Sequence, residues 1–178
     1  MKEKYKYVSN IISKDLSNFL TSWSLKNMDS YDANDTQVQK GAYCYYDSKH
    51  IFSHVSFFLQ ERIEKETGLD LRPTYTYNRI YLRGSELKPH TDRESCEISV
   101  SLSLNKSYKD ENYKWPLFMD GSPVVINECD GVIYKGPQIK HWRLPFDQPD
   151  GCWHHQLFIH YVDKNGPYAN MDESPPEK

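Results

Sequence analysis

The segment Cys96–Leu104, with the sequence CEISVSLSL, alternates apolar and polar side chains in the middle of the chain. Because successive side chains of a β-strand point to opposite faces, this alternation predicts a half-buried strand with one apolar and one polar face. An amphipathic helix would instead place its apolar residues three or four positions apart. The middle of the chain is therefore expected to be β-structure.

Further segments of strand character lie on both sides of this one, separated by Arg83-Gly84-Ser85 and by Asp-Gly, Gly-Pro and Pro-Asp-Gly breaks. In chain order the predicted strands are Thr74–Leu82, a segment around His90, Cys96–Leu104, Trp115–Met119, Pro123–Ile126, Gly131–Lys135, Lys140–Leu144 and His155–Val162. About eight strands without helical crossovers favour an antiparallel jelly roll, that is, a double-stranded β-helix of the cupin-like type.

Helical spacing is confined to the N-terminal part of the chain. One apolar set begins behind a candidate cap at Ser13 and ends at Trp23, and a second runs from Ile51 to Ile63 and ends at Gly68. The fold class is therefore mainly β with N-terminal helices (α+β). We expect a single domain over residues 1–178, with a helical support region at 1–68, a jelly-roll core at 73–163 and a flexible tail at 171–178.

Composition excludes several classes of function. The chain of 178 residues carries 22 Lys and Arg against 25 Asp and Glu, a net charge of −3, which argues against a nucleic-acid or acidic-membrane binder. Its four cysteines form no CxxC pair, and no apolar run resembles a signal peptide or a membrane span. These features predict a cytoplasmic protein with free thiols and no membrane partner.

One triplet and one distant histidine suggest a metal site. His90-Thr91-Asp92 is the only His-x-Asp sequence in the chain, and on a strand its His and Asp share a face. By itself the triplet is equally explained by a surface turn. His141 on a later predicted strand adds a second imidazole, and two His with one carboxylate form the facial triad of non-heme iron(II) oxygenases.

The stretch Tyr81–Asp92 (YLRGSELKPHTD) resembles the start of the catalytic core of 2-oxoglutarate- and iron(II)-dependent oxygenases, prolyl 4-hydroxylase-like branch. Tyr81, Gly84 and the His-x-Asp triplet match the spacing of that branch. Downstream, SVSLSLN resembles its next strand, and Asp130–Tyr134 (DGVIY) its strand before the distal histidine, with the first two residues reversed. Gln156–Asp163 (QLFIHYVD) resembles the closing strand, so the resemblance covers residues 73–163.

The resemblance implies a specific chemistry. His90, Asp92 and His141 would hold iron(II), with 2-oxoglutarate and O2 as co-substrates and ascorbate as a candidate reductant. An unactivated C–H bond of a small molecule or peptide would be hydroxylated, with succinate and CO2 as co-products. A peptidyl prolyl residue is a candidate substrate by resemblance to this branch alone.

The anchor for the distal carboxylate of 2-oxoglutarate departs from the family pattern. The family places Arg or Lys early on the last strand, where this chain has His154. Arg143 is the predicted substitute, because it lies two residues beyond His141 on the same strand face and can bind a carboxylate bidentately. The other candidates for this pocket are Tyr81, which matches the family's pocket tyrosine, Arg79 two residues before it, and Gln156 on the closing strand.

Two other readings stay open. A cupin-type metal-binding module with a sensing or ligand-binding role would keep the three ligands without 2-oxoglutarate turnover. An interaction domain without metal would require the ligands to coincide by chance. A second metal site at His154-His155 is not expected, because adjacent strand residues point to opposite faces. The loops Asp29–Tyr46 and Lys106–Lys114 are predicted to border the substrate entrance.

Overall fold

The computed structural model describes residues 3–30, 38–39, 43–46 and 51–171. The predicted tail, from residue 172 onward, lies outside the described residues, and so does most of the predicted entrance loop at residues 29–46. In the described part of the chain, neither helix is both long and apolar enough to cross a membrane.

Eleven described strands form two antiparallel sheets. The large sheet has the order β1 (Tyr5–Val8), β9 (Gly131–Tyr134), β6 (Ile98–Ser107), β11 (Trp153–Asp163), β4 (Leu71–Tyr81), β3 (Tyr43–Tyr46). The small sheet has the order β2 (Val38–Gln39), β5 (Glu86–His90), β10 (His141–Arg143), β7 (Leu117–Met119), β8 (Ser122–Val124). The predicted jelly roll is confirmed, and each of the eight predicted strands is present. The N-terminal region adds the three short strands β1, β2 and β3.

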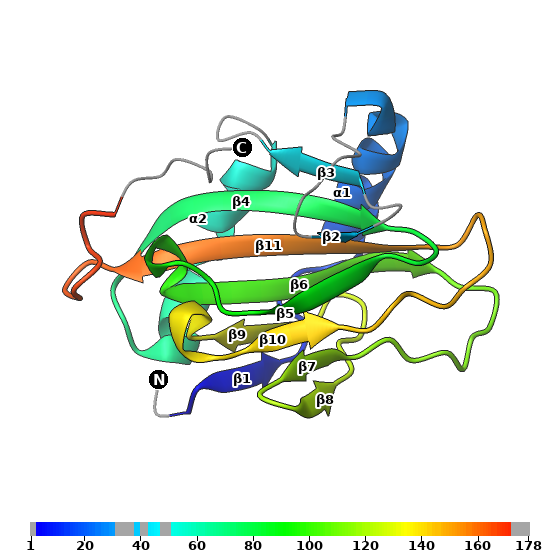
Figure 1. The fold of residues 1–178 in the computed structure, drawn as a ribbon. Coiled ribbons are helices and arrows are strands. Elements are labelled where there is room, and N and C mark those ends of the chain that lie inside the picture. Colours follow the sequence, from blue (N-terminus) through cyan, green and yellow to red (C-terminus); the bar gives the residue numbers. More distant parts are fainter. Residues whose placement is uncertain (1–2, 31–37, 40–42, 47–50, 172–178) are drawn as a thin grey trace.

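The two predicted helices are also present. Helix α1 (Lys14–Lys26) begins at Ser13, whose hydroxyl accepts a hydrogen bond of 3.2 Å from the backbone N–H of Leu16. Helix α2 (Ile51–Thr67) ends at Gly68, whose φ of 73° is the left-handed conformation that glycine adopts without strain. Both helices lie on one side of the long strands β4, β11 and β6 (Figure 1).

The apolar residues separate into two cores on opposite faces of the large sheet. One core joins the helices to the sheet, and its members include Leu20, Phe52, Val55, Leu59, Ile63, Val100, Leu102, Leu104, Leu157 and Ile159. The other core fills the space between the two sheets, and its members include Tyr75, Tyr77, Tyr81, Trp115, Val132, Tyr134, Phe146 and Phe158. Because helices cover one face and the small sheet the other, β6 and β11 are buried on both faces over most of their length.

This double burial changes the meaning of the alternating segment. The apolar residues of β6 face the helices, as expected for a core strand. Its polar residues Ser99, Ser101 and Ser103 are fully buried as well, with no exposed surface. The strand is therefore not half-buried as predicted: its hydroxyl face lies between the sheets, opposite His160, Phe158 and Gln156 of β11.

Candidate metal centre

The three predicted ligands come together between the sheets. β5 and β10 are antiparallel neighbours, and their pairing places His90 directly opposite His141, with ring centroids 4.2 Å apart. Asp92 follows β5, and its Oδ1 lies 3.6 Å from Nε2 of His90 and 3.5 Å from Nε2 of His141. Within the described residues these three side chains are close enough to hold one metal ion.

Asp92 is held by the turn that precedes β10. Its backbone N–H donates a hydrogen bond of 3.0 Å to the carbonyl of Gly136. A side chain at position 136 would be too close for this approach, because a Cβ there would lie 2.3 Å from the carbonyl oxygen of Cys96 and 2.8 Å from the Cβ of Asp92. The glycine therefore allows the turn to pack directly against the carboxylate.

Backbone hydrogen bonds set the tautomers of both histidines. Nδ1 of His90 lies 2.8 Å from the carbonyl of Lys88, and Nδ1 of His141 lies 3.2 Å from the carbonyl of Ile139. A carbonyl only accepts, so each Nδ1 carries a proton, and each Nε2, which faces Asp92, is the nitrogen left to bind a metal. Such contacts to the outer nitrogen are typical of histidines that bind metals.

The charges of the three groups suit a cation. Burial favours the neutral form of Asp92, but His90 and His141 beside it hold the pKa of its carboxyl well below the usual range. Burial lowers the pKa of His141. For His90 burial acts in the same direction, but Asp92 and the carbonyl of Lys88 together outweigh it, so the pKa is raised. Near neutral pH the carboxylate is therefore ionised and His141 is neutral, which are the forms that bind metal.

Arg143 lies two residues beyond His141 on β10 and is almost completely buried, at 2% exposure. Its guanidinium donates hydrogen bonds to the carbonyl of Trp115 (2.6 Å) and to Oε1 of Gln156 (3.0 Å), and it stacks on the Trp115 ring, 4.4 Å from the centroid. All of these partners are neutral. No carboxylate of the described chain pairs with Arg143, so its charge is buried without an anionic partner there.

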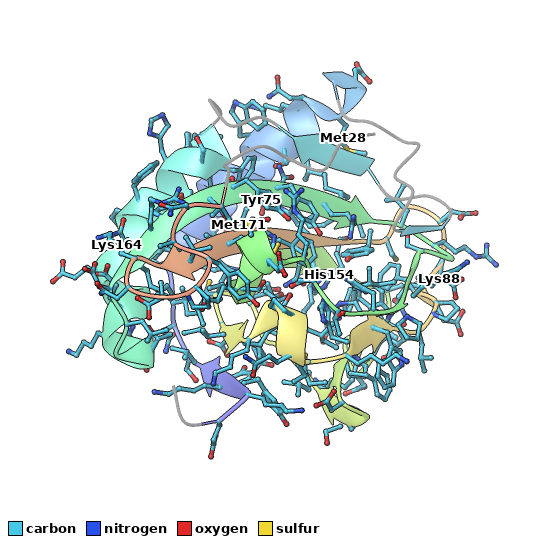
Figure 2. The ribbon with its side chains drawn as sticks, turned by 60° about the vertical axis from the view of Figure 1, so that its left-hand side comes forward. Met28, Tyr75, Lys88, His154, Lys164 and Met171 are labelled. Carbon is cyan, nitrogen blue, oxygen red and sulfur yellow. The ribbon has the colours of Figure 1, made fainter. Side chains whose placement is uncertain are left out.

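His154 shares Oε1 of Gln156 with Arg143 but is not a cation. Burial, and then the neighbouring Arg143, lower its pKa well below the usual range. Tyr108 lies 2.8 Å from its Nδ1, and Oε1 of Gln156 lies 2.9 Å from its Nε2. Figure 2 shows His154 inside the molecule, whereas Lys88 and Lys164 lie at its periphery. His155 points to the opposite face, toward Thr21 and Ser24 of α1, as the alternation predicts.

The two remaining predicted pocket residues lie on β4. Tyr81 and Arg79 have no exposed surface, and Nη1 of Arg79 donates a hydrogen bond of 3.1 Å to the hydroxyl of Tyr81. Arg79 also lies over the rings of Tyr77 and Phe158, at 5.1 and 5.5 Å from their centroids. Its charge is thus partly stabilised by aromatic faces.

Several pocket residues were not found from the sequence. Ser101, which accepts a hydrogen bond from the predicted residue Gln156, is one of them, and Ser103, whose hydroxyl is buried with no hydrogen-bond partner in the described chain, is another. Tyr108, in the predicted entrance loop Lys106–Lys114, packs beside His154, because it directly follows β6, whose last residues pair with the first residues of β11. The alternation of β6 does place the serines together on one face of the strand, although it does not show that this face is buried.

Comparison with known proteins supports the fold. No protein-family model matches the chain, and no curated protein matches it. Among solved structures, a Pseudomonas putida prolyl-4-hydroxylase matches with a TM-score of 0.69 at 17% identity, over 91% of this chain and 94% of that one. A Trichoplax adhaerens prolyl hydroxylase, solved with a peptide fragment of hypoxia inducible factor, matches with a TM-score of 0.71 at 12% identity, over 96% and 89%.

A third structure extends the match beyond prolyl hydroxylases. HygX from Streptomyces hygroscopicus, solved with nickel and 2-oxoglutarate bound, matches with a TM-score of 0.65 at 10% identity, over 91% of this chain and 84% of that one. The chain therefore has the fold of the 2-oxoglutarate- and iron(II)-dependent oxygenases. The prolyl hydroxylases predicted as its nearest branch are among the matching structures.

Proposed function

We propose that this protein is an iron(II)- and 2-oxoglutarate-dependent oxygenase that hydroxylates an unactivated C–H bond of a small molecule or peptide. The observation that carries the proposal is the pairing of two features on β10. His141 joins the His-Asp-His cluster, and Arg143 is a buried cation without a carboxylate partner in the described chain. Such a pair suits a ligand that binds a metal at one end and carries an anion at the other.

The residues of the cluster fit iron(II). Two imidazole nitrogens and one carboxylate oxygen are the donor set of the facial triad, and Nε2 of His90 and Nε2 of His141 face an ionised Asp92. This arrangement is unfavourable unless a proton or a cation lies among the three groups. When bound, iron with 2-oxoglutarate and O2 supplies the oxidative decarboxylation that hydroxylates a C–H bond and gives succinate and CO2.

The protein's own contribution at the other end of the pocket is electrostatic. A buried charge without a partner costs several kcal/mol, and an anionic ligand removes much of that cost. Arg143 would hold the distal carboxylate of 2-oxoglutarate, and its position two residues beyond His141 corresponds to about 7 Å along a strand. Two hydroxyls are further candidate donors: that of Ser103, which has no partner among the described residues, and that of Tyr81, which accepts from Arg79.

The substrate is proposed more broadly than the co-substrate. Two matching structures are prolyl hydroxylases, which supports a peptidyl prolyl residue as one candidate. HygX has also been solved with hygromycin B, and another matching structure, SnoN, is a non-heme epimerase from nogalamycin biosynthesis. A substrate screen should therefore include proline-containing peptides and small natural products, with succinate release as the common readout.

The first experiment needs no substrate. Iron(II) and 2-oxoglutarate are added to metal-free protein without oxygen, and the visible metal-to-ligand charge-transfer band is recorded. We expect a band in the unaltered protein, none in His90→Ala, and an unchanged band in His155→Gln, which alters a buried histidine on the helix face. Tight binding of cobalt(II) without any band on addition of iron(II) and 2-oxoglutarate would overturn the proposal in favour of a cupin-type module.

A further inference from the structure

His160 lies next to the candidate metal centre, and neither the triad nor the co-substrate pocket uses it. It is 3% exposed and faces the space between the sheets, directly opposite Ser99 in the β6–β11 pairing. Its Nδ1 lies 3.0 Å from the hydroxyl of Ser99, and that hydroxyl lies 2.8 Å from Oδ2 of Asp92. A continuous chain of hydrogen bonds therefore joins β11 to the candidate metal ligand.

The direction of these bonds follows from their chemistry. The single hydroxyl hydrogen of Ser99 goes to Oδ2 of Asp92, a carboxylate oxygen that accepts and that is closer, at 2.8 Å, than the carbonyl of Cys96 at 3.2 Å. Ser99 then accepts from His160, whose Nδ1 must carry the proton. Nε2 is buried and finds no acceptor in the described chain for a second proton, so the imidazole is neutral and Nε2 holds a lone pair.

Packing alone does not explain why a histidine with its proton on Nδ1 lies here. Nε2 of His160 is buried and has no hydrogen-bond partner in the described chain, and the ring lies among the aromatic rings of Tyr75 (4.5 Å) and Tyr77 (5.9 Å). An apolar side chain would fill this place without burying an unsatisfied nitrogen. The presence of a histidine at this position is explained if its Nδ1–H is needed to donate a hydrogen bond to Ser99.

We propose that His160 is a positioning residue that acts through Ser99 to hold Oδ2 of Asp92, so that Asp92 presents Oδ1 alone to the metal. Oδ1 is the oxygen that faces Nε2 of both His90 and His141. A carboxylate free to bind through both oxygens would take a further coordination position, one that a chelating co-substrate needs. This consequence for 2-oxoglutarate rests on the proposed function, whereas the orientation of the carboxylate does not.

A second metal site is the competing explanation of the same residues. Ligand atoms of Asp92, Cys96 and His160 lie within 4.8 Å of one another. However, the sulfur of Cys96 is 2.9 Å from the hydroxyl of Tyr75, and burial raises the pKa of the thiol to about 12. Ser99 also occupies Oδ2 of Asp92 and Nδ1 of His160. These contacts favour a hydrogen-bonded relay over a second ion.

Two measurements on one set of variants test the proposal. His160→Leu and Ser99→Ala each break the relay, and the double variant removes both members of this same chain of hydrogen bonds. His160→Asn places an amide N–H near the position of Nδ1. His155→Leu is the matched control, because it removes a buried neutral histidine from the other face of β11. The first readout is the visible absorption of the cobalt(II) protein, which reports coordination number, and the second is the 2-oxoglutarate Kd from the anaerobic iron(II) band.

We expect His160→Leu and Ser99→Ala each to weaken the cobalt(II) absorption, as a higher coordination number does, and to raise the 2-oxoglutarate Kd about 10-fold. The double variant should be no worse than either single one, because both act on the same bond chain. His160→Asn should recover the original spectrum, and His155→Leu should keep it. Circular dichroism identifies any variant that fails to fold, and in that event the Ser99→Ala and His160→Asn arms decide.

Three results would overturn the relay. These are a folded His160→Leu protein with the original cobalt spectrum, additive effects in the double variant, or a second cobalt equivalent with a thiolate charge-transfer band that Cys96→Ser removes. If the unaltered protein gives no iron–2-oxoglutarate band, the proposed function fails by itself. The cobalt(II) spectra contain no co-substrate and still test the relay in that case.

Discussion

Replacing Arg143 with methionine removes a buried charge from β10 and keeps a side chain of similar length. In the unaltered protein the guanidinium gives two hydrogen bonds to neutral oxygens, one on Trp115 and one on Gln156, and has no carboxylate partner in the described chain. If Arg143 binds the distal carboxylate of 2-oxoglutarate, Arg143→Met should weaken co-substrate binding while leaving the metal cluster intact.

The size of the effect follows from the bonds that are lost. A guanidinium holds a carboxylate through two parallel hydrogen bonds, and each hydrogen bond to a charged group contributes about 1.5–3 kcal/mol. The lower limit gives about 3 kcal/mol, or about a 100-fold rise in the 2-oxoglutarate Kd. Without co-substrate the effect on stability is small. Arg143→Met loses two hydrogen bonds but also removes a buried charge that has no carboxylate partner in the described chain, so the free energy of unfolding should change by no more than about 1 kcal/mol.

The assay compares two ligands by anaerobic titration of the iron(II) charge-transfer band. 2-Oxopentanoate has the same carbon chain and the same chelating end as 2-oxoglutarate but lacks the distal carboxylate. The unaltered protein should prefer 2-oxoglutarate by about 100-fold, and Arg143→Met should bind both ligands with similar, weak affinity. His154→Leu is the comparison at the family's usual position, and it should keep most of the preference because His154 is neutral.

Two outcomes would contradict this reasoning. If Arg143→Met binds both ligands with the affinities of the unaltered protein and so keeps the preference of about 100-fold, the distal carboxylate binds elsewhere, and Arg79 becomes the candidate to replace next. If the variant weakens both ligands equally, Arg143 supports the pocket as a whole and does not recognise the carboxylate.

Three further predictions concern metal, packing and pH. Cobalt(II) at 100 times its Kd should stabilise the protein by about 2.7 kcal/mol, a Tm rise of about 5–10 °C that EDTA reverses and that His141→Ala lacks. Gly136→Ala should reduce cobalt affinity at least about 10-fold in a titration, because the new Cβ would overlap the carbonyl oxygen of Cys96 and displace Asp92; unchanged affinity would show that the turn yields freely. Burial lowers the pKa of His155 to about 3, below its unfolded value of about 6.5, so its contribution to stability is complete above pH 6.5 and is lost as the pH falls toward 3. In urea unfolding, His155→Gln should therefore lose about 2 kcal/mol less than the unaltered protein between pH 7 and pH 5, and equal losses would refute this assignment.

Periodicity predicted most of the fold because long-range burial leaves a local trace in the sequence. The strands from Leu71 to Asp163 alternate or carry β-branched and aromatic residues, and turns separate them. β1 (Tyr5–Val8) and β2 (Val38–Gln39) left no such trace, because four and two residues are too few to show a period. β1 forms by pairing with Gly131–Tyr134, more than 100 positions away, and no local pattern reports such a partner.

The candidate site was predictable to a similar extent. The triplet at His90 and the later His141 were found from residue type and spacing, and the structure brings them together. What the sequence did not reveal is the environment of each group. The alternation of Ser99, Ser101 and Ser103 is typical of the solvent-facing side of a strand. All three are nevertheless buried, because β6 lies between the helices and the small sheet. A period of two shows that the faces differ, but not that the polar face is also covered.

The buried hydroxyl face of β6 links the two halves of the proposed site. Ser99 pairs with His160 at one end of this face, and Ser103 pairs with Gln156 at the other, four residues or about 13 Å along the strand. The first pair reaches the carboxylate of Asp92, and the second reaches the guanidinium of Arg143 through Gln156. One strand pair can therefore position the metal ligand at one end and the anion-binding arginine at the other. Small hydroxyl residues suit this task, since Ser99 bonds to both His160 and Asp92, and Ser101 accepts from Gln156.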